Sequence, residues 1–287
     1  MTGLSAPVRV MRARPVISFT VMAYLLSWGV WLPLLAARQG CGAVHAPQWL
    51  HLAGSLGPLV AGVVMSAVVG GRAAVADLAR RCLPRSGTRR WVTLAVLGPA
   101  GAFAVAALVC AAVGQVPDLA GTGGSEEFPE LPLAVFWLAN IVFYGFGEEV
   151  GWRGFALPYL QRRRSALSSS MVVAAIWAGW HLPLFGISAG LRDMPAIGLV
   201  GWAASIVTGS VVCTWLYNSS GGSLLALALF HGVLDIFINS PVKAALLPSV
   251  MSAAVIALAL WIPRRYGPTD LAAVSRHTIP AAATTGA

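Results

Sequence analysis

The hydrophobic positions of this chain fall into long runs separated by short polar segments. A membrane-spanning helix needs about 20 apolar residues, and eight runs reach or approach that length. Because the connections are short, neighbouring helices should be antiparallel. The pattern therefore predicts an all-α fold, a polytopic membrane helix bundle of about eight transmembrane helices. The runs are Val16–Ala37, Trp49–Gly70, Trp91–Val113, Leu133–Leu160, Ser168–Ile187, Ala196–Tyr217, Ser223–Asn239 and Lys243–Pro263.

Composition agrees with a membrane protein. The 287 residues are 57% hydrophobic and only 10% charged, whereas soluble domains carry about a quarter charged residues. In a soluble protein the net charge of +9 would suggest a nucleic-acid partner. Here the basic residues lie between hydrophobic runs, so they indicate membrane topology, with the lipid bilayer as partner and no nucleic acid. No cleavable signal peptide is evident, because the first apolar run has the length of a span.

The distribution of basic residues predicts the orientation. With the N-terminus inside, only Arg38, Arg192 and Lys243 fall in outside loops. This strong positive-inside bias places both termini in the cytoplasm of an integral cell-membrane protein. The basic residues of the inside segments are Arg9, Arg12, Arg14, Arg72, Arg80, Arg81, Arg85, Arg89, Arg90, Arg162, Arg163, Arg164, Arg264, Arg265 and Arg276.

The chain divides into one membrane domain with two short flanks. Residues 1–15 form a basic cytoplasmic arm, and residues 16–265 form the membrane domain. Residues 266–287 are a cytoplasmic tail, for which we predict disorder, most clearly at Ala281–Ala287. No disulfide is predicted, because the four cysteines are far apart and share no metal-ligand or redox spacing. They are Cys41, Cys82, Cys110 and Cys213.

Ionisable side chains well inside the runs are few, and they gather in the second half of the chain. A charge near mid-bilayer costs roughly 2.5–3.5 kcal/mol on insertion scales, so such groups mark functional sites by default. One aromatic residue, Trp177, belongs to the same set because it precedes His181 by four residues. The residues are Glu148, Glu149 and Arg153 on the fourth run, Trp177 and His181 on the fifth, and His231 and Asp235 on the seventh.

Helical spacing groups these residues, because residues four apart share a face. Glu149 and Arg153 form such a pair, as do Trp177 with His181 and His231 with Asp235. Glu148 is turned by about 100° from Glu149. The two carboxylates therefore cannot face one partner, and we expect Glu149 to pair with Arg153 while Glu148 faces a cavity.

This set of side chains is suited to activating water. A carboxylate beside an imidazole can take a proton from water, and a second imidazole or a neutral acid can donate to an oxyanion. The alternative is a zinc site, since two His with one or two carboxylates make a plausible first shell. The His-Glu-x-x-His signature is absent, and the two His lie on different helices.

Three motifs carry a family resemblance. Glu148-Glu149-Val150-Gly151-Trp152-Arg153 resembles the Glu-Glu-x-x-x-Arg motif of the type II CAAX prenyl protease and bacteriocin-processing (CPBP, or ABI) intramembrane proteases. Trp177-Ala178-Gly179-Trp180-His181 is similar to the second motif, although Phe is usual at position 177. His231-Gly232-Val233-Leu234-Asp235 resembles the third. The resemblance covers about residues 133–240, which would be the protease core.

The resemblance implies a role for each residue. Glu148 would be the general base that activates water together with His181, and His231 and Asp235 would stabilise the oxyanion. Glu149 and Arg153 would support the site or bind substrate, and Trp177 would supply an aromatic wall. An ionised Asp235 cannot donate, so it either is protonated, orients His231, or helps to hold a metal. Whether Glu148, His181, His231 and Asp235 hold a divalent metal such as zinc stays open.

We therefore predict an intramembrane endopeptidase. The Ala- and Arg-rich composition is typical of bacteria, where prenylated CAAX proteins are mostly missing. The expected substrates are then membrane-associated peptides or proteins, including bacteriocin-like precursors and membrane-anchored regulators, with prenylated proteins kept as an alternative. No oligomeric state is predicted. Two alternatives are a proton-coupled transporter and a catalytically inactive immunity or scaffold protein. Leu56-Gly57-Pro58 and Leu97-Gly98-Pro99 hint at the paired broken helices of a transporter, but one shared tripeptide is weak evidence.

Overall fold

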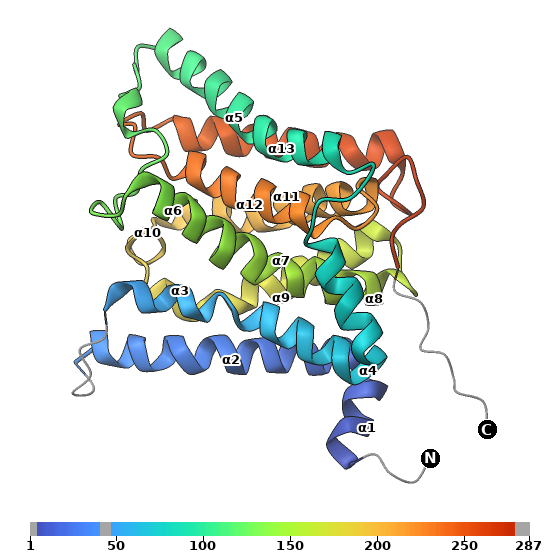
Figure 1. Cartoon of the computed structure of the whole chain (residues 1–287). Coiled ribbons are helices and arrows are strands. Elements are labelled where there is room, and N and C mark those ends of the chain that lie inside the picture. Colours follow the sequence, from blue (N-terminus) through green and yellow to red (C-terminus); the bar gives the residue numbers. More distant parts are fainter. Residues whose placement is uncertain (1–4, 41–46, 279–287) are drawn as a thin grey trace.

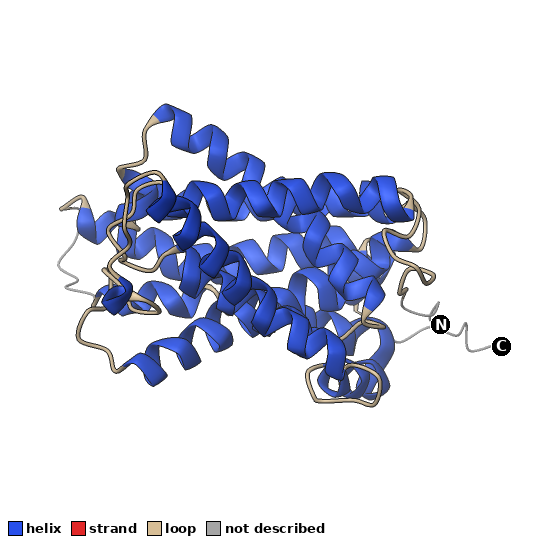
Figure 2. Ribbon diagram, turned by 90° about the horizontal axis from the view of Figure 1, so that it is seen from above, coloured by secondary structure: helices blue, strands red, loops and turns tan. Residues whose placement is uncertain are grey.

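The fold is a bundle of long helices, and every regular element within the described residues is helical (Figures 1 and 2). The computed structural model describes residues 5–40 and 47–278; Cys41 and Ala281–Ala287 lie outside these ranges. A short helix, α1 (Ala6–Ala13), precedes the bundle. The longer elements are α2 (Pro15–Arg38), α3 and α4 (His51–Gly54, Gly57–Arg81), α5 (Arg89–Ala112), the segment Leu133–Gln161, α9 (Ala166–Trp180), α11 (Ala196–Ser219), α12 (Leu224–Ile238) and α13 (Leu247–Tyr266).

Seven helices of the described chain are long and apolar enough to cross a membrane, and they coincide with seven of the eight predicted runs. The remaining run forms α12, an apolar helix of only 15 residues. At 1.5 Å per residue it is about 22 Å long, less than the roughly 30 Å of a hydrocarbon core. Much of α12 is buried inside the bundle, so it meets protein on most sides.

The two Leu-Gly-Pro tripeptides take different places in the fold. Pro58 lies in the first turn of α4, where its missing N–H has no helical partner to lose. Pro99 lies inside α5. The helix is broken just before Pro58, between α3 and α4, and α4 is interrupted again at Gly71, whose φ of 64° suits glycine. The two spans are not matching broken helices, which removes this support for a transporter.

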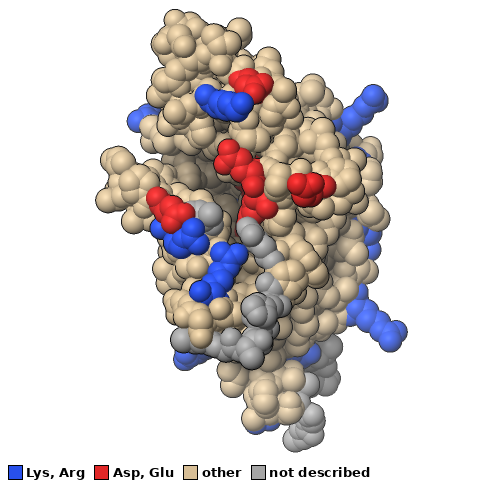
Figure 3. Space-filling view, turned by 90° about the vertical axis from the view of Figure 1, so that its left-hand side faces the viewer, with Lys and Arg blue, Asp and Glu red and all other residues tan. Residues whose placement is uncertain are grey.

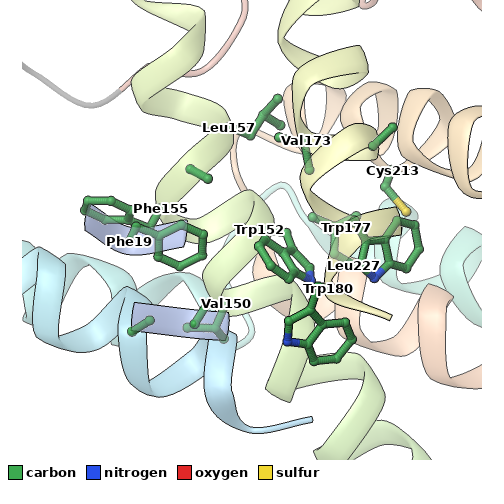
Figure 4. Packing of buried hydrophobic residues seen from close by; sticks show 14 of the residues in the cluster. Phe19, Val150, Trp152, Phe155, Leu157, Val173, Trp177, Trp180, Cys213 and Leu227 are labelled. Atoms are coloured by element: carbon green, nitrogen blue, oxygen red, sulfur yellow. The ribbon is translucent and has the colours of Figure 1, made fainter. Parts of the chain in front are cut away.

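Close backbone contacts hold the fourth span against its neighbours. A Cβ on Gly151 would clash with the carbonyl of Pro58 in α4, and a Cβ on Gly145 would clash with the carbonyl of Ala228 in α12. Large aromatic side chains fill the space beyond these contacts: Trp152 packs edge-on against Trp180 of α9, with ring centroids 5.8 Å apart (Figure 4). Small residues thus set the helix spacing, and aromatic residues fill the core.

The tail after α13 is packed where the structure describes it, which differs from the predicted disorder. Leu271 is fully buried and Ala272 nearly so. Asn218 of α11 donates to the backbone carbonyl of Asp270 at 2.8 Å, and Gln161 donates to that of His277 at 2.7 Å. Polar side chains at the ends of two helices donate these hydrogen bonds. The composition of the tail does not reveal them, because the donors lie elsewhere in the chain.

His277 makes the attachment of this tail pH-sensitive. Its ring lies edge-on to Tyr217, and burial, reinforced by the positive charge of Arg81, lowers the pKa of His277 to about 4. The undocked ring has a pKa near 6.5. Docking is therefore fully favoured above about pH 6.5 and is lost progressively as the pH falls towards 4, by up to about 2 kcal/mol near pH 5.

We expect limited proteolysis to cleave the tail faster at about pH 5 than at about pH 7.5. In His277→Gln, which cannot gain the proton, this difference should shrink. An equal pH dependence in both proteins would show that another group is responsible.

Candidate active site

The adjacent carboxylates lie midway along the fourth span, on a short α-helical segment between two π-helices. The π-helices are η3 (Asn140–Phe146) and η4 (Trp152–Ala156), and α7 (Gly147–Gly151) lies between them. The whole segment also includes α6 (Leu133–Ala139) and α8 (Leu157–Gln161). Wider π turns inside α-helices occur often at functional sites. Here they bracket Glu148 and Glu149, which are 3% and 0% exposed.

Trp177 joins Glu148 to His181. The indole Nε1 of Trp177 donates to Oε2 of Glu148 at 2.6 Å. The backbone carbonyl of the same residue lies 2.7 Å from Nδ1 of His181. Because a carbonyl only accepts, Nδ1 must carry the hydrogen, which leaves Nε2 of a neutral His181 with a lone pair. Trp177 is thus more than the aromatic wall that we predicted.

Glu149 points to a different helix. Its Oε1 accepts from Nη1 of Arg153 at 2.9 Å, as predicted, and also lies 2.9 Å from Nδ1 of His231 on α12. The bond to His231 was missed, because sequence spacing reveals partners on the same helix and not across helices. The adjacent carboxylates are therefore divided between α9 and α12, as their angular separation required.

His231 lies between two carboxylates. Its Nε2 is 3.5 Å from Oδ2 of Asp235, one turn further along α12, and its Nδ1 faces Glu149. A histidine can donate from both nitrogens only as the imidazolium. The side chain of His231 is 9% exposed and that of Asp235 is 32% exposed. In the series Glu149, His231 and Asp235, the carboxylate of Asp235 is therefore the group most exposed to solvent.

Further aromatic residues surround the imidazoles. The ring of His181 packs edge-on against Trp180 and against Trp202 of α11, at centroid distances of 4.9 and 5.8 Å. The guanidinium of Arg153 lies 5.0 Å from the ring of Trp177. Trp202 received no role in the sequence analysis, because a tryptophan in the middle of an apolar run carries no signal of its own.

The candidate residues do not form a metal site as they are placed. Within residues 5–40 and 47–278, no group of three or more His, Cys, Asp and Glu side chains could hold a metal ion. Both ring nitrogens of His231 face carboxylates, so neither presents a free lone pair to a cation. A divalent metal such as zinc at Glu148, His181, His231 and Asp235 therefore stays a prediction.

Comparison with known proteins bears on the same region. Residues 130–237 match the family model described as type II CAAX prenyl endopeptidase Rce1-like. This segment is similar to the CPBP family. The CAAX prenyl protease 2 of Methanococcus maripaludis is 26% identical over 93 residues, 31% of this chain and 34% of that protein. The match thus spans about a third of the curated relative.

The matched segment contains all of the candidate residues. It begins just before α6 and ends within α12, so it includes the paired carboxylates and both imidazoles. The preceding helices α2 to α5 lie outside the match. With seven helices of membrane-spanning length among the described residues, the chain is a multi-pass membrane protein.

Proposed function

We propose that this chain is an integral membrane endopeptidase that hydrolyses peptide bonds with water activated by Glu148. The observation that supports this most directly is the division of the two carboxylates. Glu148 bonds to the helix of His181 and Glu149 to that of His231. The three motif helices thereby place acid and imidazole groups around one polar centre within an apolar bundle. Neither the transporter nor the inactive scaffold finds support in the family match.

In the proposed reaction Glu148 is the general base. With Oε2 held by Trp177, Oε1 takes a proton from water while the hydroxide adds to the peptide carbonyl carbon. The lone pair on Nε2 of His181 orients the same water. As the C–N bond breaks, the proton on Glu148 passes to the leaving amine. The products are a carboxylic acid and an amine, and Glu148 is again a carboxylate.

His231 and Asp235 would act on the oxygen of the peptide carbonyl, which becomes the oxyanion. The N–H of His231 that faces Asp235 has only a long contact of 3.5 Å, so it is available to donate to the oxyanion that forms when hydroxide adds. Glu149 holds the opposite side of the ring, and Arg153 holds Glu149. Asp235 then acts chiefly by orienting His231, as carboxylates orient imidazoles in other hydrolases.

The substrate class that we propose is a membrane-associated polypeptide, prenylated or bacteriocin-like. A site among helices of membrane-spanning length admits a segment that already lies at the bilayer. The relative named CAAX prenyl protease 2 supports the prenylated alternative. We also propose that both termini are cytoplasmic, because 15 of the 19 Lys and Arg residues fall in the predicted inside segments.

We expect His181→Ala to lower proteolysis about 100-fold or more, the usual range for a general acid–base group, while the protein still inserts. The measurement compares new peptide termini by mass spectrometry in membranes that contain wild type or His181→Ala at equal abundance. His277→Ala is the matched control, since its ring is remote from the carboxylates. If the two variants and wild type yield the same termini, His181 has no part in proteolysis.

A further inference from the structure

We propose that helix α2 positions His181 for hydrolysis, with Ser27 and Trp28 acting through Trp180. The inference rests on the proposed function for the reaction that it serves, and on separate contacts for the positioning itself. Because they would act through another residue, Ser27 and Trp28 are positioning residues and not catalytic ones. Both precede the segment matched by the family model, residues 130–237.

The backbone just before His181 is held by α2. α9 ends at Trp180 and a 3₁₀ turn follows, and the last carbonyls of a helix need partners from outside it. Two donors near the carbonyl of Trp180 are lost, because Pro183 has no N–H and the N–H of Leu184 bonds to the carbonyl of His181 at 2.8 Å. The indole Nε1 of Trp28 donates to the carbonyl of Trp180 instead, at 2.9 Å.

The side chain of Trp180 is held by α2 as well. Its indole Nε1 donates to Oγ of Ser27 at 2.7 Å, and the hydroxyl of Ser27 donates to the carbonyl of Gly54 at 2.7 Å. In a continuous helix this carbonyl would accept from the N–H of residue 58, which is proline and has none. The break between α3 and α4 therefore directs the hydroxyl hydrogen of Ser27 to Gly54 and leaves its oxygen to accept from Trp180.

Small residues bring α2 close enough for these bonds. A Cβ on Gly57 would clash with Oγ of Ser27, and a Cβ on Gly179 would lie 2.7 Å from the hydroxyl oxygen of Tyr24. That hydroxyl donates to the carbonyl of Ile176, near the end of α9, at 2.5 Å. Three side chains of α2 therefore hydrogen-bond to the last part of α9.

α2 also contacts the chain just after η5 (Leu182–Gly186). The guanidinium of Arg38, the last residue of α2, donates to the carbonyl of Ile187. Figure 3 looks onto this end of the bundle, where charged side chains are scattered over the surface. Water competes for a hydrogen bond in such a position. The more deeply placed bonds of Ser27 and Trp28 should therefore contribute more to the positioning.

The anchored residue determines where His181 lies. The backbone of Trp180 continues directly into His181, and the two rings pack edge-on at 4.9 Å. Nδ1 of His181 is tied to the carbonyl of Trp177 in the same turn, so the position of its Nε2 follows the end of α9. A misplacement of about 1 Å in a reacting group can lower a rate about 100-fold. Loss of the anchor should lower turnover more than substrate affinity, because Nε2 acts on the attacking water.

Trp28→Phe tests the backbone anchor, because it removes the indole donor and keeps an aromatic ring. The probe is a farnesylated peptide that ends in a CAAX sequence, cleaved by purified protein in liposomes. We expect kcat to fall about 10- to 100-fold while KM changes by less than about twofold. Trp137→Phe is the matched control, since the indole of Trp137 also donates to a backbone carbonyl, that of Gly123, at 3.0 Å. A folded Trp28→Phe protein with the kcat of wild type would overturn the proposal.

Ser27→Ala and Trp180→Phe test the second bond, because each removes one partner. If the two residues act through this bond, the double variant should have about the kcat of Trp180→Phe alone. Losses of kcat that multiply would show that Ser27 does not act through Trp180. A merely structural role would lower the temperature of unfolding in detergent and leave the kcat of the folded protein unchanged, which would also contradict the inference.

Hydrogen exchange separates the positioning from the activity. Trp28→Phe should speed amide exchange in peptides that cover residues 176–187, relative to wild type and to Trp137→Phe. Exchange at the wild-type rate would reject the anchor, whether or not the protein cleaves the probe. A wild-type protein that leaves the farnesylated peptide intact would instead count against the proposed function, and the exchange rates would still decide whether α2 holds the end of α9.

Discussion

Replacing Glu148 with Gln should abolish proteolysis and leave the bundle intact. Gln keeps the size of the side chain and can still accept a hydrogen bond from Trp177, but it cannot take a proton from water. Loss of a general base lowers turnover by about 10²–10⁴-fold. The effect here should be at the upper end of this range, because no second carboxylate lies beside Trp177 to replace Glu148 as the base. The neighbouring Glu149 is held by Arg153 and His231.

The measurement is the rate of peptide cleavage by purified protein in liposomes, with new termini identified by mass spectrometry. Glu126→Gln is the matched control, because Glu126 is exposed in the loop between α5 and α6. Thermal unfolding in detergent shows whether each variant is folded. Cleavage by a folded Glu148→Gln protein at the rate of wild type would reject this residue as the base.

Removing either charge of the Glu149–Arg153 pair should strongly destabilise the protein. Both side chains are completely buried, with 2.9 Å between Oε1 and Nη1, and Glu149 also holds His231. Breaking a buried ion pair from one side leaves an uncompensated charge and costs about 3–5 kcal/mol. Glu149→Gln and Arg153→Met should each therefore lower the temperature of unfolding in detergent.

The double variant Glu149→Gln/Arg153→Met separates this cause from simple loss of packing. With neither charge of the pair left, it should be more stable than the sum of the two single changes predicts. The exposed pair Arg192 and Asp193 serves as control, since surface ion pairs contribute about 0–1 kcal/mol. Strictly additive effects at 149 and 153 would mean that the pair has no interaction of its own.

The positions of the helices could be predicted because the hydropathy of the chain largely determines them. A long apolar run has few alternatives to a membrane helix, and the predicted runs match the helices closely. The run from Ser223 to Asn239 was harder to interpret, because hydropathy does not distinguish a spanning helix from a short one buried by its neighbours. The tail to Thr278 was predicted wrongly, since its attachment depends on particular amides and not on overall polarity.

The site was predictable only in part. Spacing along one helix revealed the pairs Glu149–Arg153 and His231–Asp235, because residues four apart must be neighbours. The bonds from Trp177 to Glu148 and from Glu149 to His231 join different helices, and their existence depends on how the helices pack. The contact between the rings of Trp202 and His181 also appears only once the helices are assembled.

The π-helices beside α7 affect how insertions and deletions change the orientation of Glu148 and Glu149. A wide turn accommodates an additional residue without shifting the rest of the helix, so η3 fixes the angular phase of both carboxylates against their partners. A one-codon deletion that the wide turn does not absorb would rotate the pair by about 100° and translate it by about 1.5 Å. Hydropathy would register no difference, yet the carboxylates would lose their imidazoles. Relatives with the same membrane profile but altered chemistry are best recognised by residue count between Asn140 and Glu148.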